Sequence, residues 1–222
     1  MDAPVHRSGE GAALIEDLAH RLARRLGGSG SPSRLVVGLA GPPGSGKSTL
    51  CERLAALLDE RRLLAGAVPM DGFHLSNTVL DLLGRHGRKG APDTFDVDGY
   101  LATLDRVRAP GAPDVLAPVY RRDLHEPVAA GSLVAGPGVV LTEGNYLALA
   151  EGPWAEARAR IDVLVMVAVP EAVLVERLVA RHEAHGRAAA DAAHWVRTVD
   201  LPNASTVVSS ASRCDEVWHL TG

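Results

Sequence analysis

Short apolar runs alternate with amphipathic segments along this chain. The run RLVVGLA at 34–40 is rich in β-branched residues, which is typical of a buried strand in a parallel sheet. In 10–27 the apolar residues recur near helical spacing, which predicts an amphipathic helix. On the same criteria the other predicted strands are 65–70, 138–142, 161–169 and 215–220, and the other predicted helices are 47–62, 75–84, 97–109, 171–186 and 189–200.

The order of these elements predicts the fold class. Strands alternate with helices along the whole chain, which favours an α/β fold with a mainly parallel sheet of about five strands between two helical layers. Segments 27–33 and 85–96 are predicted as a break and a loop, and 110–118 as a break with a short extended piece. The 222 residues fit a single domain, 1–222, in which 171–200 is a candidate lid.

Composition and charge narrow the possible partners. The chain is 46% apolar and carries a net charge of -4, so neither nucleic acid nor an anionic membrane is an expected partner. No apolar run is long enough to cross a bilayer, and the first residues lack the apolar core of a signal peptide. Two cysteines make no disulfide framework. We therefore expect a cytoplasmic protein.

The segment GPPGSGKST at 41–49 matches the phosphate-binding motif G-x-x-x-x-G-K-[ST] at every fixed position. It lies between a predicted strand and a predicted helix, a context that favours this motif over an ordinary glycine-rich turn. Lys47 can reach the β- and γ-phosphates of a nucleotide, and the hydroxyl of Ser48 can bind Mg²⁺. The residues predicted to contact the nucleotide are Gly41, Pro42, Pro43, Gly44, Ser45, Gly46, Lys47, Ser48 and Thr49.

This motif predicts ATP and Mg²⁺ as cofactors but leaves the reaction open. The N-K-x-D motif for guanine is absent, which weakens a GTPase interpretation. An ATPase and a small-molecule kinase both remain.

Two acidic residues follow predicted strands. Asp71 comes after AGAVPM, and Glu143 ends GVVLTE. Ligands of parallel sheets lie at the carboxyl ends of strands, so both carboxylates are expected near the triphosphate. Phosphoryl transfer needs a metal held in place and a hydroxyl relieved of its proton, and a carboxylate pair can divide that work. A helix-capping role for Asp71 and a loop role for Glu143 are the alternatives.

Four further motifs carry a resemblance to a known family. VPMDGFHLSN, RKGAPDTFD, APVYRRDLHEP and LTEGNYLAL follow the phosphate loop in that order. Together they resemble the P-loop kinases of the uridine kinase, pantothenate kinase and phosphoribulokinase family, and within it a bacterial nucleoside/nucleotide kinase-like or fructokinase-like branch. The resemblance implies a P-loop NTPase fold of the nucleotide-kinase type, a three-layer α/β/α sandwich with a small helical lid, and a homodimer would be compatible with it.

The resemblance also implies roles for individual residues. Asp71 matches the base that accepts the proton of the acceptor hydroxyl, and Glu143 matches a glutamate near Mg²⁺. Arg181 completes, with Lys47, the predicted catalytic set. Arg177 and Arg187 resemble lid arginines that close over phosphates. The residues that the resemblance places at the acceptor are Phe73, His74, Tyr120, His125 and, less directly, Asn145, which has packing as its alternative.

Departures from the family pattern bear on the acceptor. Arg121 stands where an acidic residue is usual, and Pro127 stands where an arginine is expected, which argues against a uridine-like acceptor. Arg88 and Lys89, in the predicted loop, could bind an anionic acceptor or could be ordinary surface charge. Trp195 and Asn203 are expected near the adenine side because of the resemblance, with a core position as the alternative for Trp195.

The leading hypothesis is an ATP-dependent kinase acting on a hydroxyl of a small metabolite. A nucleoside, a pantothenate-like acid, a sugar and a sugar acid all fit the motifs. An ATPase that works as a switch, and an inactive protein that senses nucleotide, are the alternatives. The presence of Lys47, Ser48, Asp71 and Glu143 together speaks against the inactive protein.

Overall fold

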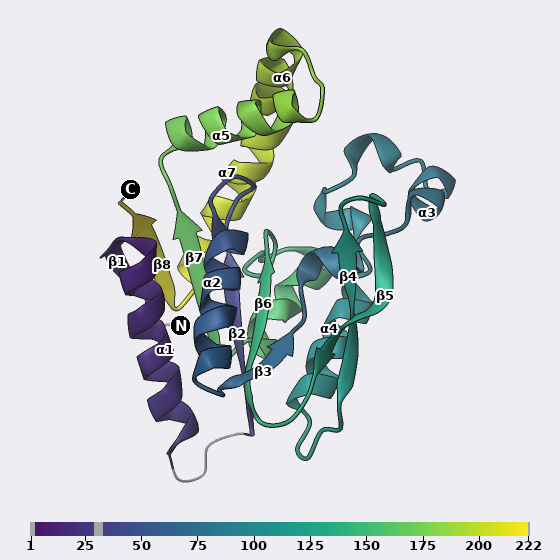
Figure 1. The fold of residues 1–222 in the computed structure, drawn as a ribbon. Helices are drawn as coiled ribbons and strands as arrows, with labels where there is room; N and C mark the ends of the chain where they lie inside the picture. The colour runs from purple at the N-terminus through teal and green to yellow at the C-terminus, as the bar shows by residue number, and fades with distance from the viewer. Residues whose placement is uncertain (1–2, 29–32, 222) are drawn as a thin grey trace.

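A six-stranded, fully parallel sheet forms the centre of the molecule (Figure 1). The computed structural model describes residues 3–28 and 33–221, so the predicted break at 27–33 lies mostly outside the described residues. The strand order is β1-β8-β7-β2-β6-β3. The strands are β1 (Val5–Gly9), β2 (Arg34–Ala40), β3 (Leu64–Ala67), β6 (Gly138–Gly144), β7 (Val163–Ala168) and β8 (Glu216–Leu220).

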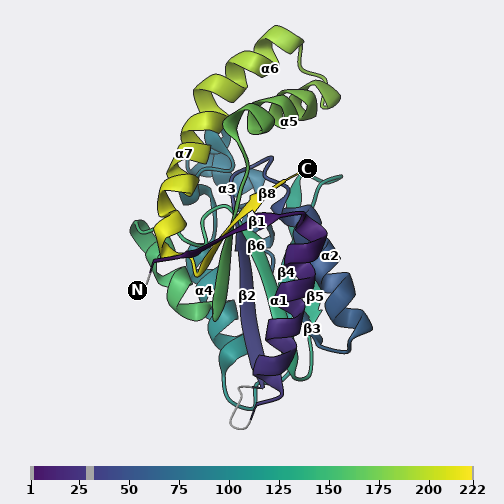
Figure 2. The same cartoon turned by 90° about the vertical axis from the view of Figure 1, so that its left-hand side faces the viewer.

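Helices cover both faces of this sheet, which confirms the predicted three-layer α/β fold (Figure 2). Alternate residues of β2 point to opposite faces. Leu35, Val37 and Leu39 pack against α1 (Gly11–Leu26) and α2 (Lys47–Glu60). Val36 and Ala40 pack on the other side. There the covering elements are α4 (Val97–Arg108), the 3-10 helix η4 (Gly152–Arg160) and α7 (Leu201–Ser209).

The sheet has six strands where about five were predicted. Strand β1 was missed because its sequence, VHRSG, has no apolar run and its side chains are mostly exposed. It pairs with β8 at the edge of the sheet, from Val5 opposite Glu216 to Gly9 opposite Leu220. Backbone pairing to a neighbouring strand therefore stabilises β1, and a pattern of side chains does not reveal that pairing.

An antiparallel hairpin of β4 (Val115–Arg121) and β5 (Glu126–Val134) was also not predicted as such. Most side chains of β5 are exposed, so they lack the alternation of a half-buried strand. The hairpin lies beside β3. Its Ser132 hydroxyl donates to the carbonyl of Ala67 at 2.7 Å. The register with β4 shifts between Ala117 and Val119.

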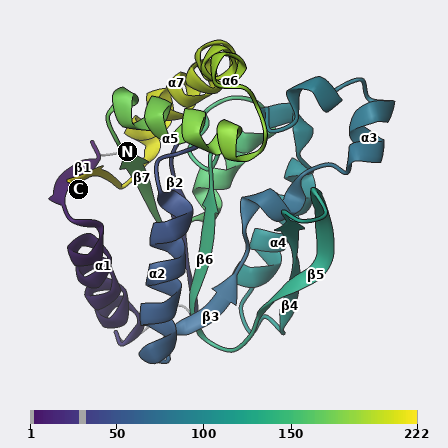
Figure 3. The same cartoon turned by 45° about the horizontal axis from the view of Figure 1, so that its top comes forward.

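Helices α5 (Glu171–Ala184) and α6 (Ala189–Trp195) project beyond the carboxyl ends of the strands (Figure 3). The chain then passes through a turn of π-helix, Val196–Asp200, into α7 without a break. The helix predicted to end at 200 therefore continues. Pro202 is tolerated there because it lies in the first turn of α7.

The remaining segments are short. Helix α3 (Asn77–Leu82) begins at Ser76, whose side chain accepts a hydrogen bond from the amide of Val79. The predicted loop 85–96 contains two single turns of 3-10 helix, His86–Arg88 and Pro92–Thr94. Within the described ranges, no helix combines the length and the apolar character that crossing a bilayer requires.

Candidate active site

The phosphate loop connects the carboxyl end of β2 to the first turn of α2. Gly44 and Gly46 have φ angles of +82° and +88°, which a glycine adopts at little cost. Gly41 leaves no room for a side chain, because a Cβ there would lie 2.9 Å from the carbonyl oxygen of Val167. The buried hydroxyl of Ser45 has no hydrogen-bond partner. The loop thus has the backbone geometry that the motif predicts.

Lys47 and two carboxylates form a charged group at the floor of the site. Burial lowers the pKa of Lys47, and the positive charges of Arg181 and Arg122 lower it further, whereas Glu143 and Asp71 raise it. Burial raises the pKa of Glu143, and so does the negative charge of Asp71, whereas Lys47 lowers it. The positive charge of Lys47 therefore offsets part of the negative charge of both carboxylates.

Sheet register explains why Glu143 meets the phosphate loop. Strands β2 and β6 are neighbours, and Leu39 pairs with Glu143. The Ser48 hydroxyl, at the start of α2, donates to Oε2 of Glu143 at 3.1 Å. No group of three or more His, Cys, Asp or Glu side chains suited to a metal occurs in 3–28 and 33–221. Two oxygen donors nonetheless fit Mg²⁺, which keeps several waters and takes further oxygens from phosphates.

Asp71 lies in the 3-10 helix η1 (Met70–Phe73), directly after β3. His74 Nε2 is 4.0 Å from its carboxylate. The ring of His74 stacks on Phe95 with centroids 4.0 Å apart, and Tyr120 lies on it at 5.1 Å. Burial lowers the pKa of His74, partly offset by Asp71. The imidazole is therefore held neutral beside Asp71.

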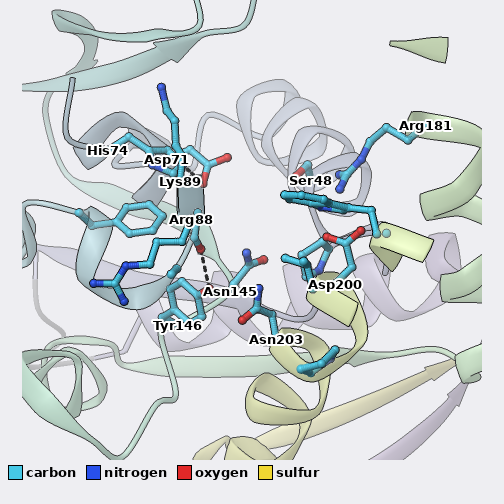
Figure 4. A pocket seen from close by; sticks show the side chains of 18 of the residues that line it. Ser48, Asp71, His74, Arg88, Lys89, Asn145, Tyr146, Arg181, Asp200 and Asn203 are labelled. Carbon is cyan, nitrogen blue, oxygen red and sulfur yellow. Dashed lines mark hydrogen bonds and ion pairs between the residues drawn. The ribbon is translucent and has the colours of Figure 1, made fainter. Parts of the chain in front are cut away.

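A cavity of about 590 Å³ joins the phosphate loop to the Asp71 turn. Figure 4 shows Asp71, His74 and Tyr146 at one end of it, and Ser48 and Arg181 at the other. The predicted site residues that line the cavity are Pro43, Gly44, Gly46, Lys47, Ser48, Thr49, Asp71, His74, Arg88, Lys89, Asn145 and Arg181. Trp195 and Asn203, expected near the adenine side, also line it.

Other predicted site residues lie behind the cavity wall. Phe73 is buried in the core, with its ring edge-on to Tyr100, because the short η1 turn points it away from Asp71. Tyr120 packs behind His74. Glu143 lies beneath Ser48, and the remaining phosphate-loop residues Gly41, Pro42 and Ser45 are buried in the loop itself.

Three more predicted residues make contacts that the sequence did not indicate. The exposed His125 has a φ of +53° in the hairpin turn. Its carbonyl oxygen, and not its ring, accepts a hydrogen bond from the Lys89 ammonium at 2.8 Å. Arg177 donates to the carbonyl of Gly44 at 3.1 Å. Arg187 stacks on Trp195, with its guanidinium carbon 4.1 Å from the ring centre. These contacts support the walls of the cavity.

Sequence reasoning missed several residues that line the cavity. Arg122 comes from the β4–β5 turn, and its neighbour Arg121 was noted only as a departure from the family pattern. Asp200 comes from the π-helical turn, a local feature that no sequence pattern predicts. The missed lining residues are Gly87, Gly90, Ala91, Phe95, Arg122, Thr198, Val199, Asp200 and Pro202.

Comparisons with known proteins show the family of this chain. No model of a known protein family matches the chain. It is 34% identical over 190 residues to the uncharacterized protein YggC of Escherichia coli, an alignment that covers 85% of this chain and 78% of that one. It is also 33% identical over 165 residues to a Schizosaccharomyces pombe protein provisionally named uridine kinase C227.14, with 71% and 70% of the two chains covered.

A solved structure extends the likeness to the fold. A protein from Silicibacter sp. TM1040, described provisionally as a fructose transport system kinase, has 36% identity and a TM-score of 0.82, and the match covers 94% of this chain and 98% of that one. The chain belongs to the P-loop kinase family of the uridine and pantothenate kinases. This confirms the resemblance drawn from the motifs. Family membership implies ATP with Mg²⁺ as the usual cofactors, and the adjacent oxygens of Ser48 and Glu143 fit such a metal.

Proposed function

We propose that this protein transfers the γ-phosphate of ATP to a hydroxyl group of a small metabolite. The observation that carries the proposal is that Lys47 of the phosphate loop and Asp71 of a separate strand end line one cavity. An ATPase needs the first residue but has no need of a second compartment beside it. The space around Asp71, His74 and Asn145 has the polar groups that a hydroxylated acceptor requires.

In this mechanism Asp71 is the general base. As the acceptor oxygen forms its bond to the γ-phosphorus, the bond from that phosphorus to the bridging oxygen of ADP breaks, and the hydroxyl proton passes to the Asp71 carboxylate. Lys47 and Arg181 stabilise the negative charge that spreads over the transferred group. Mg²⁺, held by Ser48 and Glu143, would neutralise part of the phosphate charge when bound.

The α5–α6 segment is the proposed lid. Arg177 and Arg181 lie on α5, one turn of helix apart, with Arg177 on the phosphate loop and Arg181 in the cavity. Trp195 and Asn203 line the same end and are proposed to border the adenine ring. Closure of such a segment excludes water, the competing acceptor of the phosphoryl group.

The test is the variant Asp71→Asn, which keeps the shape of the side chain and removes the basic carboxylate. We expect turnover to fall by about 10²–10⁴-fold, the range for loss of a general base, with ATP affinity within about threefold of wild type. ADP release would be measured across nucleosides, pantothenate, glycerate and fructose. Asp98→Asn serves as the matched control, since Asp98 is exposed on α4 outside this cavity. Equal turnover of Asp71→Asn and wild type would contradict the assignment of Asp71 as the general base.

A further inference from the structure

The cations on the acceptor side of the cavity differ in whether protein groups already bind them. Arg88 pairs with Asp93 at 2.5 Å. The Lys89 ammonium donates to Asn77 Oδ1 at 2.7 Å and to the carbonyl of His125 at 2.8 Å. Arg122 also lines the cavity, but no ion pair to it occurs among residues 3–28 and 33–221. Of these three cations, Arg88 has a carboxylate partner and Lys89 has two neutral hydrogen-bond acceptors, whereas Arg122 has neither kind of partner in the described part of the chain.

The fold brings Arg122 to the Asp71 end. The strand that precedes it packs so closely on the Asp71 turn that a Cβ on Gly72 would lie 2.1 Å from the carbonyl oxygen of Pro118. Tyr120, two residues before Arg122, lies on the ring of His74. The hairpin therefore cannot shift without moving the residues around Asp71, and its turn is held over the acceptor side.

Its neighbour Arg121 provides the contrast. Arg121 donates to both carboxylate oxygens of Asp123, at 2.9 and 2.7 Å, within the same exposed turn. It does not line the cavity. Two adjacent arginines thus have different environments, one paired at the surface and one unpaired over the site.

The carboxylates of the cavity do not compensate Arg122 either. Asp71 and Asp200 are the two acidic residues that line it within the described ranges. Asp200 is buried, with Oδ2 2.7 Å from His182 Nε2. Asp71 lies between Lys47 and His74 and is the proposed base. Glu143 is close enough for Arg122 to lower its pKa but forms no ion pair with it, so the Arg122 guanidinium is free to pair with an anionic group of a ligand.

We propose that Arg122 binds an anionic group of the phosphate acceptor, so that the acceptor is a hydroxylated compound bearing a carboxylate or a phosphate. This rests on the proposed kinase function. His74 and Asn145 line the same cavity and are polar side chains that suit the hydroxyl groups of the same molecule. A guanidinium matches the planar geometry of both carboxylate and phosphate.

The binding experiment uses pairs of compounds that differ mainly in the charged group. Protein saturated with Mg²⁺ and a non-hydrolysable ATP analogue is titrated calorimetrically with glycerate and glycerol, with pantothenate and pantothenol, and with fructose 6-phosphate and fructose. We expect at least one anionic compound to bind at least about fivefold more tightly than its neutral partner, the modest size reflecting the exposure of Arg122. The glycerate and pantothenate pairs test recognition of a carboxylate, and the fructose 6-phosphate pair tests recognition of a phosphate.

Two matched variants assign the preference. Arg122→Gln should abolish it while leaving affinity for the ATP analogue unchanged, and Arg121→Gln should retain it. Binding of the neutral partner as tight as the anionic one, no binding of any anionic compound, or a preference that survives Arg122→Gln would each overturn the proposal. Equal weakening of ATP-analogue and acceptor binding in Arg122→Gln would also overturn it, since Arg122 would then be a nucleotide ligand.

ADP release with the same compounds keeps the two proposals separate. Preferential binding of an anionic compound without any phosphate transfer would contradict the kinase function and leave the role of Arg122 standing. Transfer to a neutral compound with a higher kcat/KM than to its anionic partner would leave the kinase function standing and overturn the role of Arg122.

Discussion

The two ends of the cavity differ in how their residues are brought together. At the phosphate end, nine consecutive residues that run from the end of β2 into the first turn of α2 form the loop, and Glu143 joins them from the neighbouring strand in register. At the acceptor end, the residues come from four separate segments: 71–74, 87–91, the 122 turn and 145–146. Contacts between segments, such as Gly72 against Pro118, hold that end together.

This difference indicates which end of the cavity tolerates substitutions. The phosphate loop rests on strands whose side chains are buried on both faces of the sheet, so its backbone is firmly placed. The acceptor end depends on a hairpin whose second strand is mostly exposed, and substitutions there disturb little of the core. We therefore expect changes at the phosphate end to abolish activity, and changes at the acceptor end other than at Asp71, the proposed base, to alter which compound is used.

Among the comparisons of the two ends, the largest effect should come from replacing Lys47 at the phosphate end. Lys89, at the acceptor end, provides the matched comparison. Lys47→Ala should lower both ATP affinity and turnover, turnover by about 10²–10³-fold, because the group that stabilises the transferred phosphate is lost. Lys89→Ala should leave ATP affinity unchanged, because its ammonium contacts Asn77 and His125. Titration with a fluorescent ATP analogue and steady-state ADP release measure both. Equal loss of ATP affinity in the two variants would contradict the division into two ends.

A glycine pair tests the contact that assembles the acceptor end. In Gly72→Ala the new Cβ would lie 2.1 Å from backbone, so the hairpin must move, and we expect a loss of stability of about 1–3 kcal/mol with a raised KM for the acceptor. Gly87→Ala meets nothing within 4 Å and should leave the stability unchanged. Urea unfolding and acceptor KM values check this. A stable Gly72→Ala with unchanged KM would show that the hairpin does not position Asp71.

Arg187 and Trp195 test whether the nucleotide end extends to α6. Removing the guanidinium from the Trp195 ring in Arg187→Ala should raise the KM for ATP by about two- to fivefold, as expected for loss of an exposed cation–π contact, with the KM for the acceptor unchanged. Arg197→Ala, exposed in the next turn and outside the cavity, is the control. If only the KM for the acceptor changed, the proposal that Trp195 borders the adenine ring would be contradicted.

The smallest effect concerns pH. Burial lowers the pKa of His74 in the folded protein, so below about pH 6.5, the ordinary value for histidine, the unfolded chain binds a proton that the folded protein resists. This contribution to stability is complete above that pH and is lost as the pH falls toward the lower folded value. His74→Gln should therefore show a shallower loss of unfolding free energy between pH 7 and pH 5, measured by urea unfolding. A steeper loss in the variant would mean that His74 is protonated in the folded protein.

Local patterns predicted much of the fold and one end of the site. Strand β2 was predicted with its observed bounds, and helix α2 follows the phosphate loop as expected, because continuous apolar runs and the motif report on short-range structure. Strand β1 was not predicted, because its stability comes from pairing with β8, more than 200 residues later in the chain. The β4–β5 hairpin escaped prediction for a similar reason.

The sequence by itself determined the α/β class, the phosphate loop and the two acidic strand ends at Asp71 and Glu143, since each depends on residues close together in the chain or on strands that end at one edge of a sheet. Only the tertiary structure decided which neighbouring side chains reach the cavity. Contacts between segments that are distant in the chain bury Phe73 in the core and place Arg122 in the cavity. Side-chain direction at a turn depends on what packs against that turn, and no pattern along the chain carries that information.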